Sequence, residues 1–306
     1  MKNNILLNEV KKYLSFLQFE KKLSINTVNS YWFDLKMYIS YLIDKYRIES
    51  FQSIGHKHIK DYIQNIYKFK NNTSYGNASI NRTISSIKNF HKYLLLNEIV
   101  KKDASKLMKS IKLKQTLPNV LTVEEIDKII DSIDLSQKNG LRNKALIMLM
   151  YSSGLRVSEL VNLSLINFYI DDDIIRIFGK GQKERLVPIG GKAKTILLMY
   201  ISNKRPQYSR KSDSKGIIFL SNRGKPLSRK TVWNIIRIVS LQSGINKKVT
   251  PHTFRHSFAS HLLEGGANLR VVQELLGHTN ISTTQIYTHL DKTYLKEIHK
   301  EFHPRG

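Results

Sequence analysis

Residues 250–256 read Thr-Pro-His-Thr-Phe-Arg-His and carry side chains suited to handling a phosphate. Thr250 can cap a helix, and Pro251 suits its first position. His252 and Arg255 then stand three apart in the first turn or so, where free N–H groups and the helix dipole already favour an anion. The pair is a candidate phosphate cradle with a proton donor. The alternative is a basic first turn on a solvent-exposed helix.

The histidines of this segment also raise the question of a metal site. His256 follows His252 by four positions, a spacing that can chelate zinc on one helix face. The segment has no Glu between the two, no further ligand is evident, and the chain has no cysteine. We therefore expect no metal and no other cofactor, and we expect structural roles for His256 and His261.

A second constellation is Gly-Leu-Arg-Val-Ser-Glu-Leu at residues 154–160. Arg156 follows one expected helix end and begins another short helix. Glu159, three positions on, shares its face and could orient the guanidinium or accept a bond from nearby backbone. The alternative is an ordinary surface ion pair, which contributes little to stability.

Lys180 stands between Gly179 and Gly181 in a segment that reads as a hairpin tip. Glycine on both sides lets the backbone approach a ligand closely. Lys183 and Arg185 follow and add to the positive charge. A glycine turn that merely happens to be basic is the alternative.

The last constellation is Leu-Leu-Gly-His at residues 275–278, followed nine residues later by Tyr287. Taken alone, a tyrosine near the end of a helix is typical of a core or surface aromatic.

Two groups of elements would position these residues. In the first part of the chain, apolar positions recur at helical spacing in four segments, which predict a small bundle. The segments are 5–19, 25–45 after a Ser24 cap, 56–68 and 78–96. The second part reads as helices at about 123–133, 140–153, 191–203 and 229–243, a strand pair within 174–189, a short strand at 217–220 and several short helices at the end. The predicted fold class is mainly α with a small antiparallel β-sheet in the second domain.

The length of 306 residues favours two domains. We expect an N-terminal helical domain at 1–108, a basic, Pro-containing linker at 109–121 and a C-terminal domain at 122–306. The net charge is +26, and residues 1–115 and 116–306 share it equally. Two basic domains fit a clamp around nucleic acid, although codon bias of an AT-rich genome is another source of lysine.

Composition also excludes several classes of protein. Without cysteine, the chain has no disulfide scaffold, no thiol nucleophile and no Cys-ligated metal site. No apolar run reaches the length that spans a bilayer, and the charged start lacks a secretory core. We therefore expect a cytoplasmic protein that has no membrane partner.

The order of these motifs resembles the tyrosine recombinase (phage-integrase) family: Arg, a hairpin Lys, His-x-x-Arg, Gly-His, then Tyr. The strings GLRVSEL, GKGQKERLVPI, TPHTFRHSFASHLLEGGANLRVVQELLGH and TTQIYTH are similar to bacterial Xer recombinases. The resemblance covers nearly the whole chain, because the basic helical part matches that family's N-terminal core-binding, SAM-like DNA-binding domain. The distal part of that domain matches less distinctly.

The resemblance implies a catalytic set and a reaction. The set is Arg156, Lys180, His252, Arg255, His278 and Tyr287, with Glu159 as an orienting residue. The implied reaction is metal- and ATP-independent cleavage and rejoining of DNA through a 3′-phosphotyrosine on Tyr287. Arg156 and Arg255 would stabilise charge on the phosphate. Lys180 would be the general acid, His252 a base or proton shuttle, and His278 a hydrogen-bond donor to the phosphate.

The implied partners are double-stranded DNA recombination sites and further recombinase protomers. In relatives, an amphipathic C-terminal helix like the one expected at 290–306 docks on a neighbouring protomer, which implies a homo-tetramer or a hetero-tetramer with a second Xer-type recombinase. The alternative is packing on the same subunit. Whether a DNA translocase activates the protein stays open.

The expected bundle begins within a few residues of Met1, which leaves no room for a separate arm-binding domain and favours a resolvase of chromosome or plasmid dimers. Four alternatives stay open at this point. They are a compact integrase of a mobile element, a type IB topoisomerase, a non-catalytic DNA-binding regulator and a metal-dependent nuclease.

Overall fold

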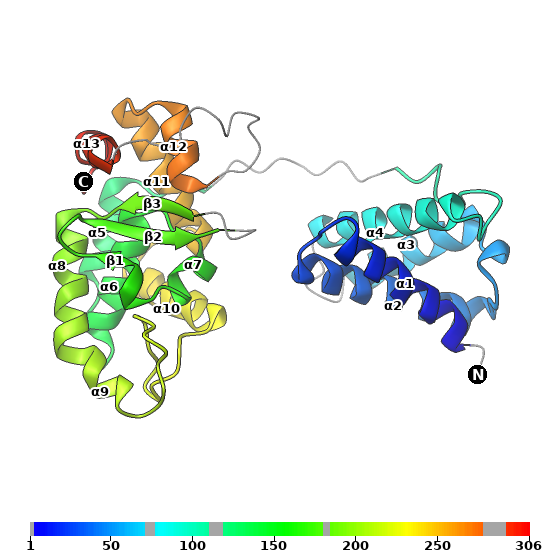
Figure 1. The fold of residues 1–306 in the computed structure, drawn as a ribbon, viewed down its shortest axis with the longest axis horizontal. Helices are drawn as coiled ribbons and strands as arrows, with labels where there is room; N and C mark the ends of the chain where they lie inside the picture. Colours follow the sequence, from blue (N-terminus) through cyan, green and yellow to red (C-terminus); the bar gives the residue numbers. More distant parts are fainter. Residues whose placement is uncertain (1–2, 71–76, 110–118, 180–183, 278–291) are drawn as a thin grey trace. The chain divides into compact units, whose positions relative to one another are not determined.

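A computed structural model describes residues 3–70, 77–109, 119–179, 184–277 and 292–306. The chain separates into two compact units, Met1–Thr116 and Leu117–Gly306 (Figure 1). Each unit has its own hydrophobic core. Among the described helices, none is long and apolar enough to cross a membrane.

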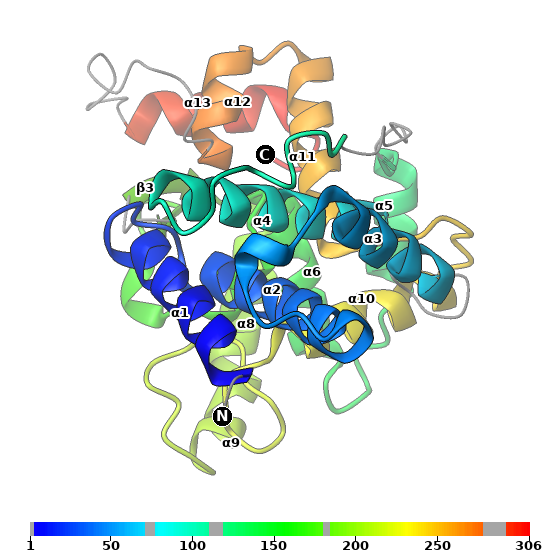
Figure 2. The ribbon, with the colours of Figure 1, turned by 90° about the vertical axis from the view of Figure 1, so that its right-hand side faces the viewer.

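The first unit is a bundle of four helices (Figure 2). The bundle consists of α1 (Asn3–Phe19), α2 (Ile25–Tyr46), α3 (His56–Lys70) and α4 (Asn77–Leu96), with a 3₁₀ turn η1 (Phe51–Ser53) before α3. Ser24 caps α2, since its hydroxyl accepts a hydrogen bond from the Thr27 N–H at 3.3 Å. The four helices and this cap are confirmed, with ends within two residues of the predicted positions.

The core of this bundle comes from the predicted apolar stripes. Val10, Leu35 and Ile39 are completely buried, as are residues of α3 and α4 such as Ile59 and Ile84. Burying such side chains contributes roughly 1.5–3 kcal/mol each. These stripes are therefore a packed core, as predicted.

The second unit combines a group of helices with a small sheet at its side (Figure 1). Strands β1 (Phe168–Tyr169), β2 (Ile174–Phe178) and β3 (Glu184–Pro188) are antiparallel in the order β1-β2-β3. The helical elements are α5 (Val123–Asp131), α6 (Gly140–Ser152), α7 (Val157–Val161), η2 (Leu165–Asn167), α8 (Gly191–Met199), the π-helical turn η4 (Tyr200–Lys204), α9 (Arg205–Ser209), α10 (Arg229–Gln242), α11 (Pro251–Gly265), α12 (Leu269–Leu276) and α13 (Lys292–Phe302). The predicted fold class, mainly α with a small antiparallel sheet, is confirmed.

Helix α6 is the central element of the second unit. Most of its residues are buried, including the run 145–152, because the helix is apolar around most of its circumference. It packs against α8 and α11. The chain leaves α6 through Gly154, whose φ of +55° lies in the left-handed region that glycine favours. That turn directs the chain into α7.

Two predicted elements differ in the structure. The strand predicted at 217–220 is wrong: Ile217 bridges Ser164 and Leu220 bridges Pro226, each as an isolated pair. The apolar run exists because Ile218 is completely buried in the core, and within the described ranges no second strand runs beside it. The helix predicted at 191–203 is α-helical only to Met199 and continues as the η4 turn.

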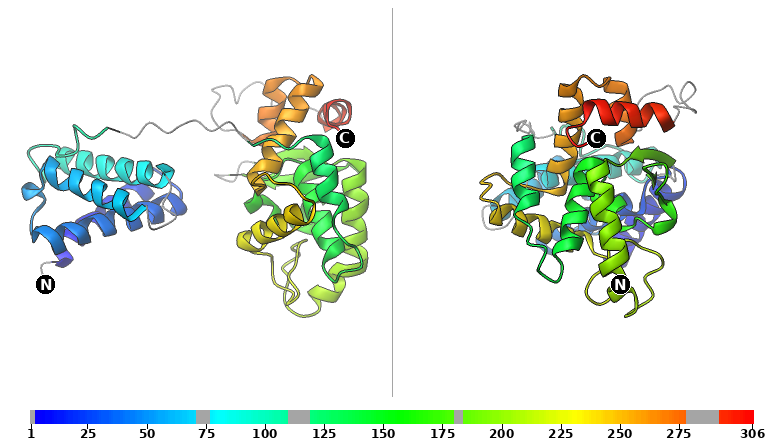
Figure 3. Two further views of the ribbon diagram at one scale, coloured as in Figure 1. Left: turned by 180° about the vertical axis from the view of Figure 1, so that it is seen from behind. Right: turned by 90° about the vertical axis from the view of Figure 1, so that its left-hand side faces the viewer.

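The C-terminal helix packs on its own unit, against α11 and β3 (Figure 3). His299 Nε2 lies 2.6 Å from the Ser152 carbonyl oxygen, and Arg305 pairs with Asp127. At Gly265 an added Cβ would lie 2.5 Å from the Phe302 carbonyl oxygen, so the helices approach closely. In this single chain the helix packs within its own subunit, and docking on a neighbouring protomer stays a prediction.

Candidate active site

The two arginines of the predicted catalytic set lie on different helices, and their side chains meet at the end of a third helix, α12. Arg156 is the N-cap residue of α7, and Arg255 lies in the first turns of α11. The start of α11 is fixed as predicted, since Thr250 caps it by accepting from the Thr253 N–H at 3.2 Å, and Pro251 is its first residue. Both guanidinium groups reach the C-terminal end of α12.

Glu159 is the anionic centre of an arginine cluster that consists of Arg156, Arg185 and Arg255. The side chain of Glu159 is only 4% exposed. Its carboxylate accepts from the Arg156 backbone N–H at 2.8 Å and from Arg156 Nη1 at 2.9 Å. Arg185 donates two parallel bonds to the same carboxylate, at 2.8 and 2.7 Å. Arg255 Nη1 lies 4.0 Å from Glu159 Oε2. One carboxylate therefore orients one guanidinium, binds a second and lies near a third.

Three successive carbonyl groups at the end of α12 each accept a hydrogen bond from a different arginine. The pairs are Leu275 O with Arg185 Nε at 2.8 Å, Leu276 O with Arg255 Nη2, and Gly277 O with Arg156 Nη2 at 3.0 Å. The last carbonyls of a helix have no intrahelical partner and form the negative end of its dipole. This helix end therefore completes the coordination of the arginine cluster.

The cluster has a surplus of positive charge, three guanidinium groups against one carboxylate. Burial lowers the pKa of Arg255 to about 9, together with the charges of Arg156 and Arg185, while Glu159 acts in the opposite direction. Burial would raise the pKa of Glu159, but hydrogen bonds from Arg185 and Arg156 and the charge of Arg185 hold it below its usual value. An anion at this site would neutralise the surplus. Arg156, 34% exposed, is the most accessible of the three arginines.

His252 lies on the first turn of α11 with an exposed side chain. Partial burial of its ring lowers its pKa, and the charges of His256, Arg255 and Arg156 lower it further. The imidazole is therefore neutral near pH 7 and can accept a proton.

The other two histidines of α11 differ from each other. His256 is exposed, whereas His261 is buried with Nδ1 2.8 Å from the Tyr151 hydroxyl. His261 therefore has the structural role predicted for it. Among the residues that the structure describes, no group of three or more His, Asp or Glu side chains is arranged to hold a metal ion.

Three predicted site residues, Lys180, His278 and Tyr287, lie outside the described residues. The described part brings together Arg156, Glu159 and Arg255, which stand up to about a hundred positions apart in the chain. Sequence reasoning missed the contribution of Arg185 and of the α12 carbonyls. The available signal was weak, namely a charged residue directly before the apolar part of a strand and a glycine at a helix end.

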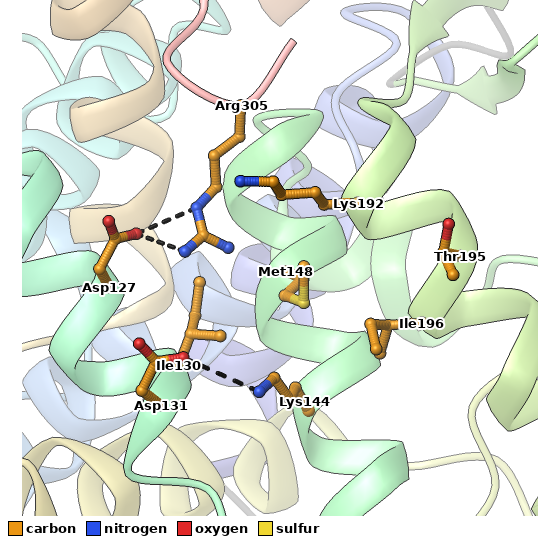
Figure 4. Close-up of a pocket in the computed structure, with 9 residues that line it drawn as sticks. All are labelled: Asp127, Ile130, Asp131, Lys144, Met148, Lys192, Thr195, Ile196 and Arg305. Atoms are coloured by element: carbon orange, nitrogen blue, oxygen red, sulfur yellow. Dashed lines mark hydrogen bonds and ion pairs between the residues drawn. The ribbon is translucent and has the colours of Figure 1, made fainter.

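A cavity of about 540 Å³ lies elsewhere in the second unit, between α5, α6, α8 and the C-terminal segment (Figure 4). Its charged lining includes Asp127, Asp131, Lys144, Lys192 and Arg305. Arg305 points into it and pairs with Asp127. Among the described residues, none that lines this cavity belongs to the arginine cluster.

Two family models match the chain. Residues 119–293 match the model described as the phage integrase family, and residues 10–98 match the phage integrase N-terminal SAM-like domain. The first match covers more than half of the chain.

The chain is similar to curated relatives along nearly its whole length. Tyrosine recombinase XerD of Chlorobaculum tepidum is 43% identical over 297 residues, covering 96% of this chain and 95% of that protein. Tyrosine recombinase XerD of Staphylococcus aureus strain Mu50 is 40% identical over 97% of this chain and 99% of that protein.

Solved structures share the fold. The XerH site-specific recombinase bound to palindromic difH substrate, in a post-cleavage complex, aligns with a TM-score of 0.69 and 22% identity over 95% of this chain and 83% of that one. A lambda integrase dimer bound to a COC′ core site aligns with a TM-score of 0.67 and 17% identity, over 89% of this chain and 94% of that one.

Proposed function

This chain belongs to the phage integrase family and is a site-specific tyrosine recombinase, and from that premise we propose that it resolves chromosome or plasmid dimers. The observation that carries the chemical part of the proposal is the cluster of Arg156, Glu159 and Arg255 at the end of α12. Its surplus positive charge suits a phosphodiester that gains charge in the transition state. The role in dimer resolution rests on the similarity to the relatives named XerD.

In the proposed reaction, the Tyr287 oxygen attacks the scissile phosphorus. A bond forms between that oxygen and phosphorus, and the bond from phosphorus to the 5′-oxygen breaks. The products are a 3′-phosphotyrosine and a free 5′-hydroxyl. Attack by the 5′-hydroxyl of a partner strand reverses these steps, so the number of phosphodiester bonds is conserved and no ATP is needed.

The roles of the remaining residues follow from their chemistry. Arg156 and Arg255 stabilise charge on the non-bridging oxygens, because a planar guanidinium donates two bonds in fixed geometry. Lys180 donates a proton to the leaving 5′-oxygen, and His278 donates a hydrogen bond to the phosphate. His252, whose lowered pKa keeps it neutral, accepts or relays the Tyr287 proton. Glu159 orients Arg156.

The proposed partners are double-stranded DNA sites and further recombinase protomers. We assign DNA binding by the N-terminal domain to residues 1–108, linkage to 109–121 and catalysis to 122–306. The neighbours of similar fold include recombinases bound to DNA sites. A tetramer of this chain, or one shared with a second Xer-type recombinase, would act on two sites in the cytoplasm, with a DNA translocase as a further candidate partner.

A nicked suicide duplex tests the reaction. The duplex carries the sequence that the protein selects from random DNA, and loss of the short strand beyond the nick traps the covalent intermediate. We expect the wild type to form an adduct on a denaturing gel, in EDTA as well as in buffer. Tyr287→Phe should bind the duplex without forming the adduct. An adduct with Tyr287→Phe, or none with the wild type, would overturn the assignment.

Mapping the selected sequence tests the biological role. A single site near the replication terminus, or one on a multicopy plasmid, supports dimer resolution. A site at the ends of a mobile element would instead support a compact integrase.

A further inference from the structure

We propose that Arg185 is a positioning residue that holds three parts of the active site in register. The inference rests on the proposed function, because its role is defined by the reaction at the phosphate. Arg185 does not belong to the catalytic set carried over from the family resemblance. The observation behind the proposal is that the buried side chain of Arg185 forms hydrogen bonds to two other segments of the site.

Each nitrogen of the Arg185 guanidinium donates one hydrogen bond to the protein. Nη1 and Nη2 bind the two oxygens of Glu159, and Nε binds the Leu275 carbonyl oxygen. The side chain is only 9% exposed. With each of its three nitrogens already bonded and little surface accessible, Arg185 acts through Glu159 and α12 rather than on DNA itself.

The three segments joined by Arg185 contain or adjoin, in the sequence, three of the predicted catalytic residues: Arg156, Lys180 and His278. Glu159 orients Arg156 at the start of α7. Arg185 itself lies in β3, which follows the segment containing Lys180 in the sequence. Leu275 lies in the last turn of α12. The next residues, 276 and 277, contribute the carbonyl groups that accept hydrogen bonds from Arg255 and Arg156. The residue at position 278 is the one predicted to donate a hydrogen bond to the phosphate.

The close packing at the helix end supports the same inference. An added Cβ at Gly277 would lie 3.1 Å from Arg185 Cδ and 3.2 Å from its Nη1. Gly277 has a φ of +65° and donates its N–H to α12 carbonyls as the C-cap. The side chain of Arg185 therefore fills the space beside the turn that leads out of α12, and it limits how that turn can move.

Only an arginine satisfies this geometry. A planar guanidinium binds both carboxylate oxygens and still directs Nε to a third acceptor, whereas an ammonium has no such fork. Loss of Arg185 leaves Glu159 bonded to Arg156 alone and the Leu275 carbonyl without this donor. Small misplacement of groups around a reacting phosphate can cost on the order of 100-fold in rate.

The test compares Arg185→Gln and Arg185→Lys with Arg176→Gln as a matched control. Arg176 lies in β2 of the same hairpin, 5.6 Å from the ring centroids of Tyr169 and Phe178. Two quantities are measured on the suicide duplex, the dissociation constant and the single-turnover rate of adduct formation. Both Arg185 variants should keep wild-type DNA affinity and lose on the order of 100-fold in rate. The control should change the rate by less than about twofold.

A double-mutant cycle with Glu159→Gln separates positioning from general structural support. If Arg185 acts through Glu159, the double variant should be less than about tenfold slower than the slower single variant. If the rate loss of the double variant equals the product of the two single-variant rate losses, the inference is overturned. A wild-type rate in Arg185→Lys would also overturn it, as would a loss of DNA affinity in Arg185→Gln that is as large as its loss of rate. Wild-type protein that forms no adduct would refute the proposed function instead, so the two failures are distinguishable.

Discussion

Arg156 and Gly277 are separated by 121 positions in the sequence, yet Arg156 Nη2 donates a hydrogen bond to the Gly277 carbonyl oxygen at 3.0 Å. The same guanidinium bonds to Glu159 through Nη1. Arg156 is therefore held on two sides, by a carboxylate and by a helix end. Such preorganisation lowers the cost of arranging donors at the moment of reaction.

Arg156→Lys should lose most of the cleavage activity. A lysine ammonium cannot reproduce the fork that binds Glu159 and Gly277 and also faces the phosphate. We expect the adduct to form at least about 100-fold more slowly, with the DNA dissociation constant little changed, because removing one such transition-state donor typically costs about 10²–10³ in rate. Single-turnover kinetics on the suicide duplex measure this. Arg210→Lys, at a surface position on the far end of α9, is the control, and a near-wild-type rate in Arg156→Lys would contradict the phosphate role.

Gly154→Ala should destabilise the second unit. Gly154 has a φ of +55°, and a Cβ there would lie 2.4 Å from Phe258 Cδ1 in the core. Backbone strain and overpacking of this kind cost about 1–3 kcal/mol each. The Gly154 carbonyl also accepts a bond from Arg255 Nη1 at 2.7 Å, so cleavage should slow as well.

Thermal unfolding compares Gly154→Ala with Gly191→Ala. Gly191 begins α8, and an added Cβ there would meet no atom within 4 Å, so its replacement should leave the melting temperature unchanged or slightly raised. An equal melting temperature for the two variants would show that the turn at Gly154 tolerates a side chain.

The helices and caps of this protein could be predicted from the sequence because their causes are local. Ser24 and Thr250 cap the helices that were predicted to follow them. Glu159 was predicted to face Arg156 from spacing alone, and it does so. These features depend on residues three or four positions apart, and helical periodicity fixes their geometry.

The remaining features depend on tertiary packing, which periodicity does not reveal. Arg185 reaches from strand β3 to Glu159 in helix α7 and to Leu275, which is 90 positions away, so no sequence pattern assigns it a partner. Carbonyl groups carry no side-chain signature at all. The apolar run at 217–220 looked like a strand because burial alone favours such residues, whether or not a neighbouring strand exists.

Glu159→Gln should weaken both the fold and the site. In the described part of the chain, its carboxylate is the one negative charge within bonding distance of Arg156 and Arg185, and removing one partner of a buried ion pair costs about 3–5 kcal/mol. Its loss also removes the interaction that raises the pKa of Arg255 against the effects of burial and like charge. We expect a lower melting temperature and a slower cleavage rate. Glu264→Gln, an exposed change on α11, is the control, and equal stability of the two variants would contradict this account.

The last turn of α13 and the residue that follows this helix carry a pair of buried histidines that should make the second unit sensitive to acid. The rings of His299 and His303 stack with centroids 4.8 Å apart, and both are nearly inaccessible. Burial lowers the pKa of His303, as do the charges of His299, His261 and Arg305. Burial also lowers the pKa of His299, although its bond to the Ser152 carbonyl opposes this.

Because both histidines have a lower pKa in the folded unit than the usual value near 6.5, the unfolded state binds more protons below that pH. Their contribution to stability is therefore fully present above about pH 6.5 and falls as the pH drops, by up to about 1.4 kcal/mol per histidine per pH unit. We expect the melting temperature to be lower at pH 5.5 than at pH 7.5. His303→Phe removes one titrating group and keeps a ring in the stack. The fall in melting temperature between pH 7.5 and pH 5.5 should therefore be smaller for this variant than for the wild type. For the control His256→Gln, at an exposed position, the melting temperature should fall as much as for the wild type. If the melting temperature of His303→Phe falls just as much, His303 is not held neutral.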